Sequence, residues 1–99
     1  MTVPKRRLVL MLKIKTGFVL REIANQTIAV PIGQRTSEVH GVVALSESGA
    51  LLWNELSKGA EKETLINILL ETYEIDRETA VADVDDFIKG LSEQGVMEE

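Results

Sequence analysis

The chain of 99 residues is long enough for one domain that buries a core without a metal ion or a disulfide. It contains no cysteine, which excludes a disulfide framework, a thiolate metal site and a thiol nucleophile. Residues 1–45 hold seven Lys and Arg against two Asp and Glu, whereas residues 46–99 hold four against fourteen. The acidic second half has the wrong sign for a surface that binds duplex nucleic acid.

The first residues imitate a signal peptide, with a basic start followed by the apolar run Leu8 to Leu12. That run is shorter than the roughly 7–15 residues of a signal core, and no small-residue cleavage site follows. No apolar run approaches the roughly 20 residues of a membrane helix. We therefore expect a cytoplasmic protein that does not contact a membrane, with a domain over residues 15–99 and a frayed N-terminal extension over residues 1–14.

The first half of the chain predicts three short strands. Residues 16–23 are rich in β-forming residues, and their side chains alternate between the two faces of a strand. The dipeptide at 25–26 predicts a tight turn, and residues 27–30 predict a second strand. The polar residues 34–38 predict a loop, and the apolar run at 39–45 predicts the third strand. Three strands in this order predict an antiparallel meander.

The second half predicts three helices. The first begins after the N-cap Ser46 and ends at Gly59, the second covers residues 62–73, and the third begins after the N-cap Asp76 and ends at Gly95. Their apolar residues recur at helical spacing: Leu52, Trp53 and Leu56; Leu65, Ile66, Leu69, Leu70 and Tyr73; Ala80, Val84, Phe87 and Leu91. We expect an α+β fold in which a three-stranded antiparallel sheet is followed by three helices. We also expect Trp53 and Phe87 in the core and the Tyr73 hydroxyl near solvent.

Few residues are candidates for catalysis or metal binding. The single histidine, His40, has only Glu38 as a close carboxylate, and two groups do not make a catalytic or metal site. We expect His40 to be structural or to contact a peptide. The carboxylates Asp83, Asp85 and Asp86 lack the ligand pattern of a calcium loop, which predicts a solvated helix face. No catalytic residue, cofactor or metal is expected.

The third strand lacks the features that usually protect an exposed edge. Residues 39–45 contain no Lys, no Pro and no inward charge, and the third strand of a meander lies at its edge. Either the N-terminal extension or a second copy of the chain covers this edge, or a partner peptide adds to it as a fourth strand. On the third helix, Val81 and Ile88 widen the apolar face on one flank, which favours a groove for a peptide; a broader core contact is the alternative.

Several segments together resemble the PqqD family. They are FVLRE at 18–22, the strand at 42–45 leading to Ser46, GALLWNEL at 49–56 followed by Gly59, LINILLETYEID at 65–76, and ADVDDFIKGLSEQGVM at 82–97. The resemblance covers about residues 14–97. It rests on spaced apolar, Trp, Tyr and Gly positions and includes no catalytic signature.

The resemblance implies a fold similar to a winged helix-turn-helix and a function without catalysis. Family members recognise the leader of a ribosomally made precursor peptide and deliver it to a modifying enzyme, often a radical S-adenosylmethionine maturase; pyrroloquinoline quinone biosynthesis is one such pathway. The leader is expected to pair with the third strand in a groove beside the third helix. The implied groove residues are Val39, His40, Val42, Val43, Ala44 and Leu45 on the strand, and Val81, Asp85 and Ile88 on the helix.

Two other classes of protein compete with this interpretation. A winged-helix DNA-binding regulator would insert the third helix into the major groove, but residues 76–91 carry five acidic and two basic side chains. The second class is a small subunit of an enzyme complex that binds no peptide, and no sequence feature excludes it. The unguarded strand edge also permits a homodimer.

Overall fold

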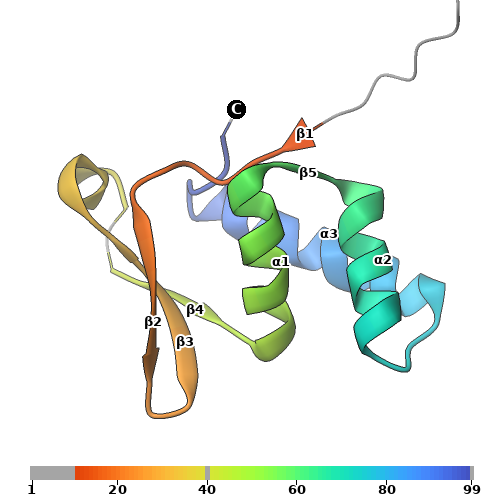
Figure 1. Ribbon diagram of the computed structural model, residues 1–99. Helices are drawn as coiled ribbons and strands as arrows, with labels where there is room; N and C mark the ends of the chain where they lie inside the picture. The colour runs from red at the N-terminus through yellow and green to blue at the C-terminus, as the bar shows by residue number, and fades with distance from the viewer. Residues whose placement is uncertain (1–10, 40, 99) are drawn as a thin grey trace, which may run out of the picture.

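The computed structural model describes residues 11–39 and 41–98. Its elements, in chain order, are β1 (Met11–Leu12), β2 (Phe18–Ile23), β3 (Gln26–Pro31), the 3₁₀ helix η1 (Gly33–Ser37), β4 (Val43–Leu45), α1 (Glu47–Lys58), β5 (Ala60–Glu61), α2 (Lys62–Thr72) and α3 (Arg77–Glu93). The sheet of β2, β3 and β4 lies on one side of α1, α2 lies on the other, and α3 crosses behind both (Figure 1). The predicted α+β class, a three-stranded antiparallel sheet followed by three helices, is confirmed.

A tight hairpin joins β2 to β3, with a register that runs from Phe18 opposite Pro31 to Ile23 opposite Gln26. The two loop residues, Ala24 and Asn25, have φ angles of 51° and 66°. Two successive left-handed residues match the right-handed twist of the flanking strands, which is why such turns dominate two-residue hairpins. The turn therefore lies one residue earlier than the predicted 25–26.

The third strand of the meander is shorter than predicted. β4 covers Val43–Leu45 and pairs with β3, and the prediction that the strand includes Val39, Gly41 and Val42 is wrong; His40 lies outside the described residues. Two local features shorten the strand. The Val39 N–H donates to the Arg35 carbonyl oxygen (3.0 Å), and Gly41 has a φ of 88°, which leaves the extended region.

A 3₁₀ helix replaces the loop predicted at residues 34–38. The hydroxyls of Thr36 and Ser37 donate to the carbonyl oxygens of Gly33 and Gln34, at 2.7 and 2.8 Å. The side chains thus give these two backbone carbonyl oxygens a hydrogen bond within a tight turn. For this reason a polar stretch without a periodic apolar pattern still forms a short 3₁₀ helix.

The helix boundaries follow the capping residues of the sequence. The Gly49 N–H donates to Ser46 Oγ (3.1 Å) at the start of α1, and the Thr79 N–H donates to Asp76 Oδ1 (2.8 Å) at the start of α3. α1 ends at Gly59, whose φ of 93° cannot continue a helix. α2 ends at Thr72, one residue before the predicted end.

The core lies between the inner face of the sheet and the three helices. Its buried members are Ile14, Ala29, Val39, Val43, Leu45, Leu52, Trp53, Leu56, Ala60, Leu65, Ile66, Leu69, Ala80, Val84, Leu91, Val96 and Met97. The predicted core role of Trp53 is confirmed. Within the described part of the chain, no helix has the length and apolar character needed to cross a membrane.

The last residues of the predicted frayed extension are packed onto the domain. β1 pairs with β5 between α1 and α2, and Ile14 is 3% exposed. The Ile14 N–H donates to the Leu56 carbonyl oxygen (3.0 Å), and Ile14 also bridges to Met97 near the C-terminus. Both partners are distant in sequence, so no local pattern announces this pairing. Residues 1–10 of the extension lie outside the described residues.

Candidate functional site

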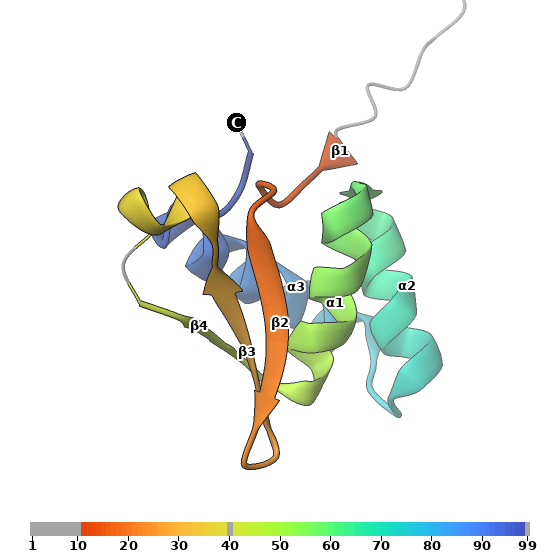
Figure 2. The same cartoon turned by 60° about the vertical axis from the view of Figure 1, so that its left-hand side comes forward.

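The outer edge of β4 is one of the two edges of the three-stranded sheet. The strand order is β2-β3-β4, so within residues 11–39 and 41–98 no strand pairs with the far side of β4. Figure 2 shows β4 at this margin, with α3 behind it. Val43 and Leu45 point into the core, at 3% and 5% exposure, whereas Ala44 is exposed. What β4 offers a partner is therefore its backbone N–H and C=O groups.

The predicted groove residues that precede β4 lie in different environments. Val39 is 7% exposed and lies at the end of η1, so it belongs to the core and not to a strand edge. Val42 is 52% exposed and directly precedes β4. His40 lies outside the described residues, so its contact with a peptide stays a prediction.

The predicted helix side of the groove is the flank of α3 that carries an ion pair to α2. Val81, Asp85 and Ile88 recur at i, i+4 and i+7 and therefore share one side of the helix. Asp85 forms an ion pair with Lys62, the first residue of α2. Val81 and Ile88 are partly buried against the core. This flank thus has a contact to α2, and its place in a groove beside β4 stays a prediction.

The opposite flank of α3 faces the junction of β4 and α1. Phe87 is half-buried there: its Cε1 lies 3.2 Å from the position of a Cβ added to Gly49, and Leu45 Cβ lies 3.8 Å from that position. Asp83 and Gly90 lie four residues before and three after Phe87, on the same flank. Helical periodicity identifies Phe87 as apolar and inward-facing, but it does not say which neighbour each flank meets.

A hollow opens at the C-terminal end of β4, between the start of α1 and α3. Two adjoining cavities, of about 320 and 250 Å³, share Ser46, Ser48, Leu69 and Asp83 in their walls. The remaining lining residues are Glu47, Gly49, Leu52, Tyr73, Ile75, Asp86 and Phe87. We call these two cavities together the α1–α3 hollow. Because Ser46 directly follows Leu45, the hollow begins where β4 ends.

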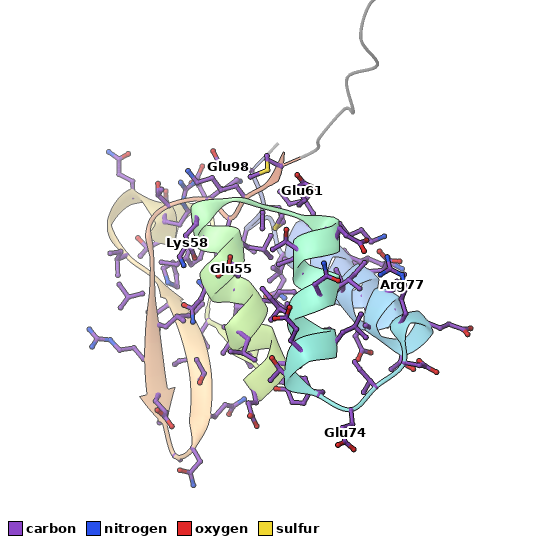
Figure 3. The ribbon with its side chains drawn as sticks, turned by 45° about the vertical axis from the view of Figure 1, so that its right-hand side comes forward. Glu55, Lys58, Glu61, Glu74, Arg77 and Glu98 are labelled. Carbon is purple, nitrogen blue, oxygen red and sulfur yellow. The ribbon has the colours of Figure 1, made fainter. Side chains whose placement is uncertain are left out.

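The rim of the α1–α3 hollow is acidic. Glu47, Asp83 and Asp86 are exposed and have no ion-pair partner within the described residues. Some acidic groups elsewhere do have ion-pair partners, such as Asp85 with Lys62, and Glu63 with Arg77 at 2.6 Å. Figure 3 shows Arg77 at the start of α3, on the side of α2. Three carboxylates without an ion-pair partner among the described residues thus border the hollow.

Tyr73 lines the same hollow, and its side chain carries a buried polar atom. Its hydroxyl oxygen is buried and has no hydrogen-bond partner in residues 11–39 and 41–98. The prediction that this hydroxyl lies near solvent is wrong, because the chain turns after α2 and packs Ile75 beside it at the cavity. An unpaired buried hydroxyl can still accept or donate a hydrogen bond.

The described residues hold no arrangement typical of a metal centre. No group of three or more His, Asp or Glu side chains among them is placed to bind a metal ion. The site consists of a strand edge without a partner in the described residues, the α3 flank that carries Phe87, and an acidic hollow. Such an arrangement suits binding of an extended chain by backbone pairing.

Comparison with known proteins gives a family and a related fold. The family model described as coenzyme PQQ synthesis protein D (PqqD) matches residues 34–97, which include β4 and all three helices. The chain is also similar to a solved structure, TbiB1 in complex with the TbiA(beta) leader peptide, with a TM-score of 0.68 and 22% sequence identity. That match covers 87% of this chain and 94% of the other. No curated protein sequence matches significantly.

Proposed function

Because the chain belongs to the PqqD family, we propose that it captures the leader of a ribosomally made precursor peptide and presents it to a modifying enzyme. The observation that carries the proposal is the free backbone edge of β4 beside α3. It is supported by the shared fold with TbiB1, whose solved structure is a complex with a leader peptide. In this proposal the protein binds and presents, and the partner enzyme performs the chemistry.

The proposed mechanism is addition of the leader to β4 as a fourth strand. Main-chain hydrogen bonds to Val43–Leu45 supply affinity, and neighbouring side chains select the sequence. Val42 and Ala44 line the strand side, and Phe87 and Gly90 replace Val81, Asp85 and Ile88 on the helix side. We choose these helix residues instead of the predicted ones because Asp85, on the predicted flank, pairs with Lys62 of α2.

Several finer assignments belong to the same proposal. The peptide-binding domain includes residues 11–14 as well as 15–99, because β1 and Ile14 pack onto it. The modifying enzyme is a radical S-adenosylmethionine maturase, in the quinone pathway or another one, and the protein acts in the cytoplasm. A homodimer through β4 would compete with the leader for the same edge.

A backbone-methylation scan tests this mechanism directly. Labelled peptides covering the N-terminal segments of short reading frames beside the coding region are titrated against the full chain by fluorescence anisotropy. The peptide that binds is then N-methylated at single positions. Strand addition predicts that every second methyl group in the paired segment abolishes binding, whereas the alternating ones are tolerated, because only alternate N–H groups face β4.

Two results would contradict the proposal. If none of the peptides binds, leader capture is wrong for this chain. If a peptide binds but tolerates N-methylation throughout, the leader is recognised through its side chains, and addition to β4 is wrong.

A further inference from the structure

We infer that the α1–α3 hollow selects a leader that carries a lysine or arginine next to the segment paired with β4. This inference rests on the proposed function and specifies the leader's chemistry. It starts from the position of the hollow: Leu45 ends β4, and Ser46 turns the chain into α1. A strand added to β4 therefore leaves the edge beside Ser46, where the hollow begins.

The lining of the hollow matches an amphipathic side chain. Its floor is apolar, with Leu52, Leu69 and Phe87, whereas its rim carries the exposed carboxylates of Asp83 and Asp86. Lysine and arginine bury an aliphatic stem on apolar surface and keep the charged end at a polar rim. The hollow thus offers both parts of such a side chain a suitable surface.

The charges of the hollow are available to a ligand. Asp83 and Asp86 have no cationic partner within the described residues, although Asp85 between them pairs with Lys62. Glu47 adds a third carboxylate to the lining. An acidic leader residue would be repelled here, and a neutral apolar one would fit the floor but gain nothing at the rim.

Tyr73 completes the lining beside the acidic rim and adds aromatic surface on which an aliphatic stem can pack.

A small-molecule titration tests the hollow without any leader. n-Butylguanidinium chloride is added to the ¹⁵N-labelled full chain, with 1-pentanol as the neutral probe of similar length. We expect the amides of Ser46, Ser48 and Asp83 to shift with the guanidinium at millimolar concentration. The double variant Asp83→Asn/Asp86→Asn should weaken this response about three- to tenfold, as expected for a few exposed charge contacts.

The matched control is Asp85→Asn, which removes a carboxylate from the other flank of the same helix. It should leave the response unchanged. An equal response to 1-pentanol, or equal losses in the Asp85 and Asp83/Asp86 variants, would overturn the inference.

A second arm uses the leader peptide identified by the methylation scan. Replacing its basic residue with glutamine should weaken binding about three- to tenfold to the native chain and much less to the Asp83/Asp86 double variant. A peptide that pairs with β4 but shows no such coupling overturns the inference and leaves the proposed function standing. Absence of any peptide binding contradicts the proposed function instead, and the guanidinium titration then decides whether the hollow binds cations.

Discussion

Trp53 connects the sheet to the helices. It is 3% exposed, and its ring meets Phe18 edge-on with 5.5 Å between the centroids. Trp53→Ala should lower the free energy of unfolding by about 3–5 kcal/mol, because it leaves a cavity in the core. Domains are stable by only about 5–15 kcal/mol, so this variant should be marginally folded. Denaturant unfolding measures the effect, with Trp53→Phe as the milder control; an unchanged midpoint would contradict the structural role.

Asp76 gives α3 a pH-dependent cap. Hydrogen bonds from the Thr79 side chain and then its backbone N–H stabilise the carboxylate and hold the pKa of Asp76 below its ordinary value of 3.8. A lowered folded-state pKa adds stability above the unfolded-state pKa, and this stability is lost as the pH falls through the folded-state pKa. Asp76→Asn keeps a capping oxygen but cannot titrate.

The two proteins should therefore differ in their acid response. The native chain should be more stable than Asp76→Asn near neutral pH. This difference in stability should disappear as the pH falls below about 4, where the carboxyl becomes protonated. Thermal unfolding at a series of pH values measures this difference. Parallel melting curves for the two proteins down to low pH would show that the cap contributes nothing through its charge.

Single-residue features were predictable where their cause is local. The N-caps Ser46 and Asp76 bond to backbone groups three residues ahead, so sequence alone identifies them. The Tyr73 hydroxyl was placed wrongly, because its burial depends on how the chain packs after α2. An apolar residue such as Val39 suits both a strand edge and a buried turn. The sequence therefore predicts a strand there, whereas the bond from the Val39 N–H to the Arg35 carbonyl oxygen places it after η1.

At the scale of elements, the two flanks of α3 differ. Gly90 lies on the flank of Phe87, which is the side of the proposed leader groove. Gly90 is in the helix interior, and a Cβ there would meet no atom within 4 Å. Gly90→Ala should therefore raise the free energy of unfolding by about 0.5–1 kcal/mol, because alanine loses less backbone entropy in a helix. The added methyl group also projects from the groove flank, so larger residues at this position should weaken leader binding.

Gly95 is the matched control for this substitution. Its φ of 75° disfavours any side chain, so Gly95→Ala should destabilise the protein. Thermal melts of both variants make the comparison, and a destabilised Gly90→Ala would show that this flank of α3 is packed rather than open.

The sequence predicts the elements themselves better than their mutual placement. Alternation and helical spacing identify the hairpin, β4 and the three helices. They also identify a widened apolar face on α3, and Asp85 on the same flank pairs with Lys62 of α2. Which flank meets which neighbour depends on the direction in which α3 crosses α1 and α2, and that direction is set by contacts between distant residues.

For the whole molecule, residues 11–14 join the two ends of the domain. Ile14 bonds to Leu56 and bridges to Met97, which closes the core at the C-terminus. Ile14→Ala should cost about 2–5 kcal/mol of stability. Met11 is 57% exposed in the neighbouring strand, so Met11→Ala is the matched control and should change little. Equal midpoints for both variants in urea unfolding would show that the N-terminal pairing does not contribute to stability.

This closure is the part of the fold that the sequence did not predict. A two-residue strand carries no periodicity, and its partner β5 is itself a two-residue link between α1 and α2. The core stripes of the helices are long and periodic, and the structure confirms their burial except at Leu70, Tyr73 and Phe87, which are partly buried against the core. Short pairings between distant segments are visible only in three dimensions.

Hydrogen exchange at β4 tests the central claim, that a leader peptide adds to this edge, most directly. Amide exchange rates and ¹⁵N chemical shifts are recorded for the full chain with and without a saturating leader peptide. The account predicts that amides within Val43–Leu45 shift and that those facing the free edge become protected, because they gain strand partners. Protection confined to β2 or to the α2-facing flank of α3, with β4 unchanged, would contradict it.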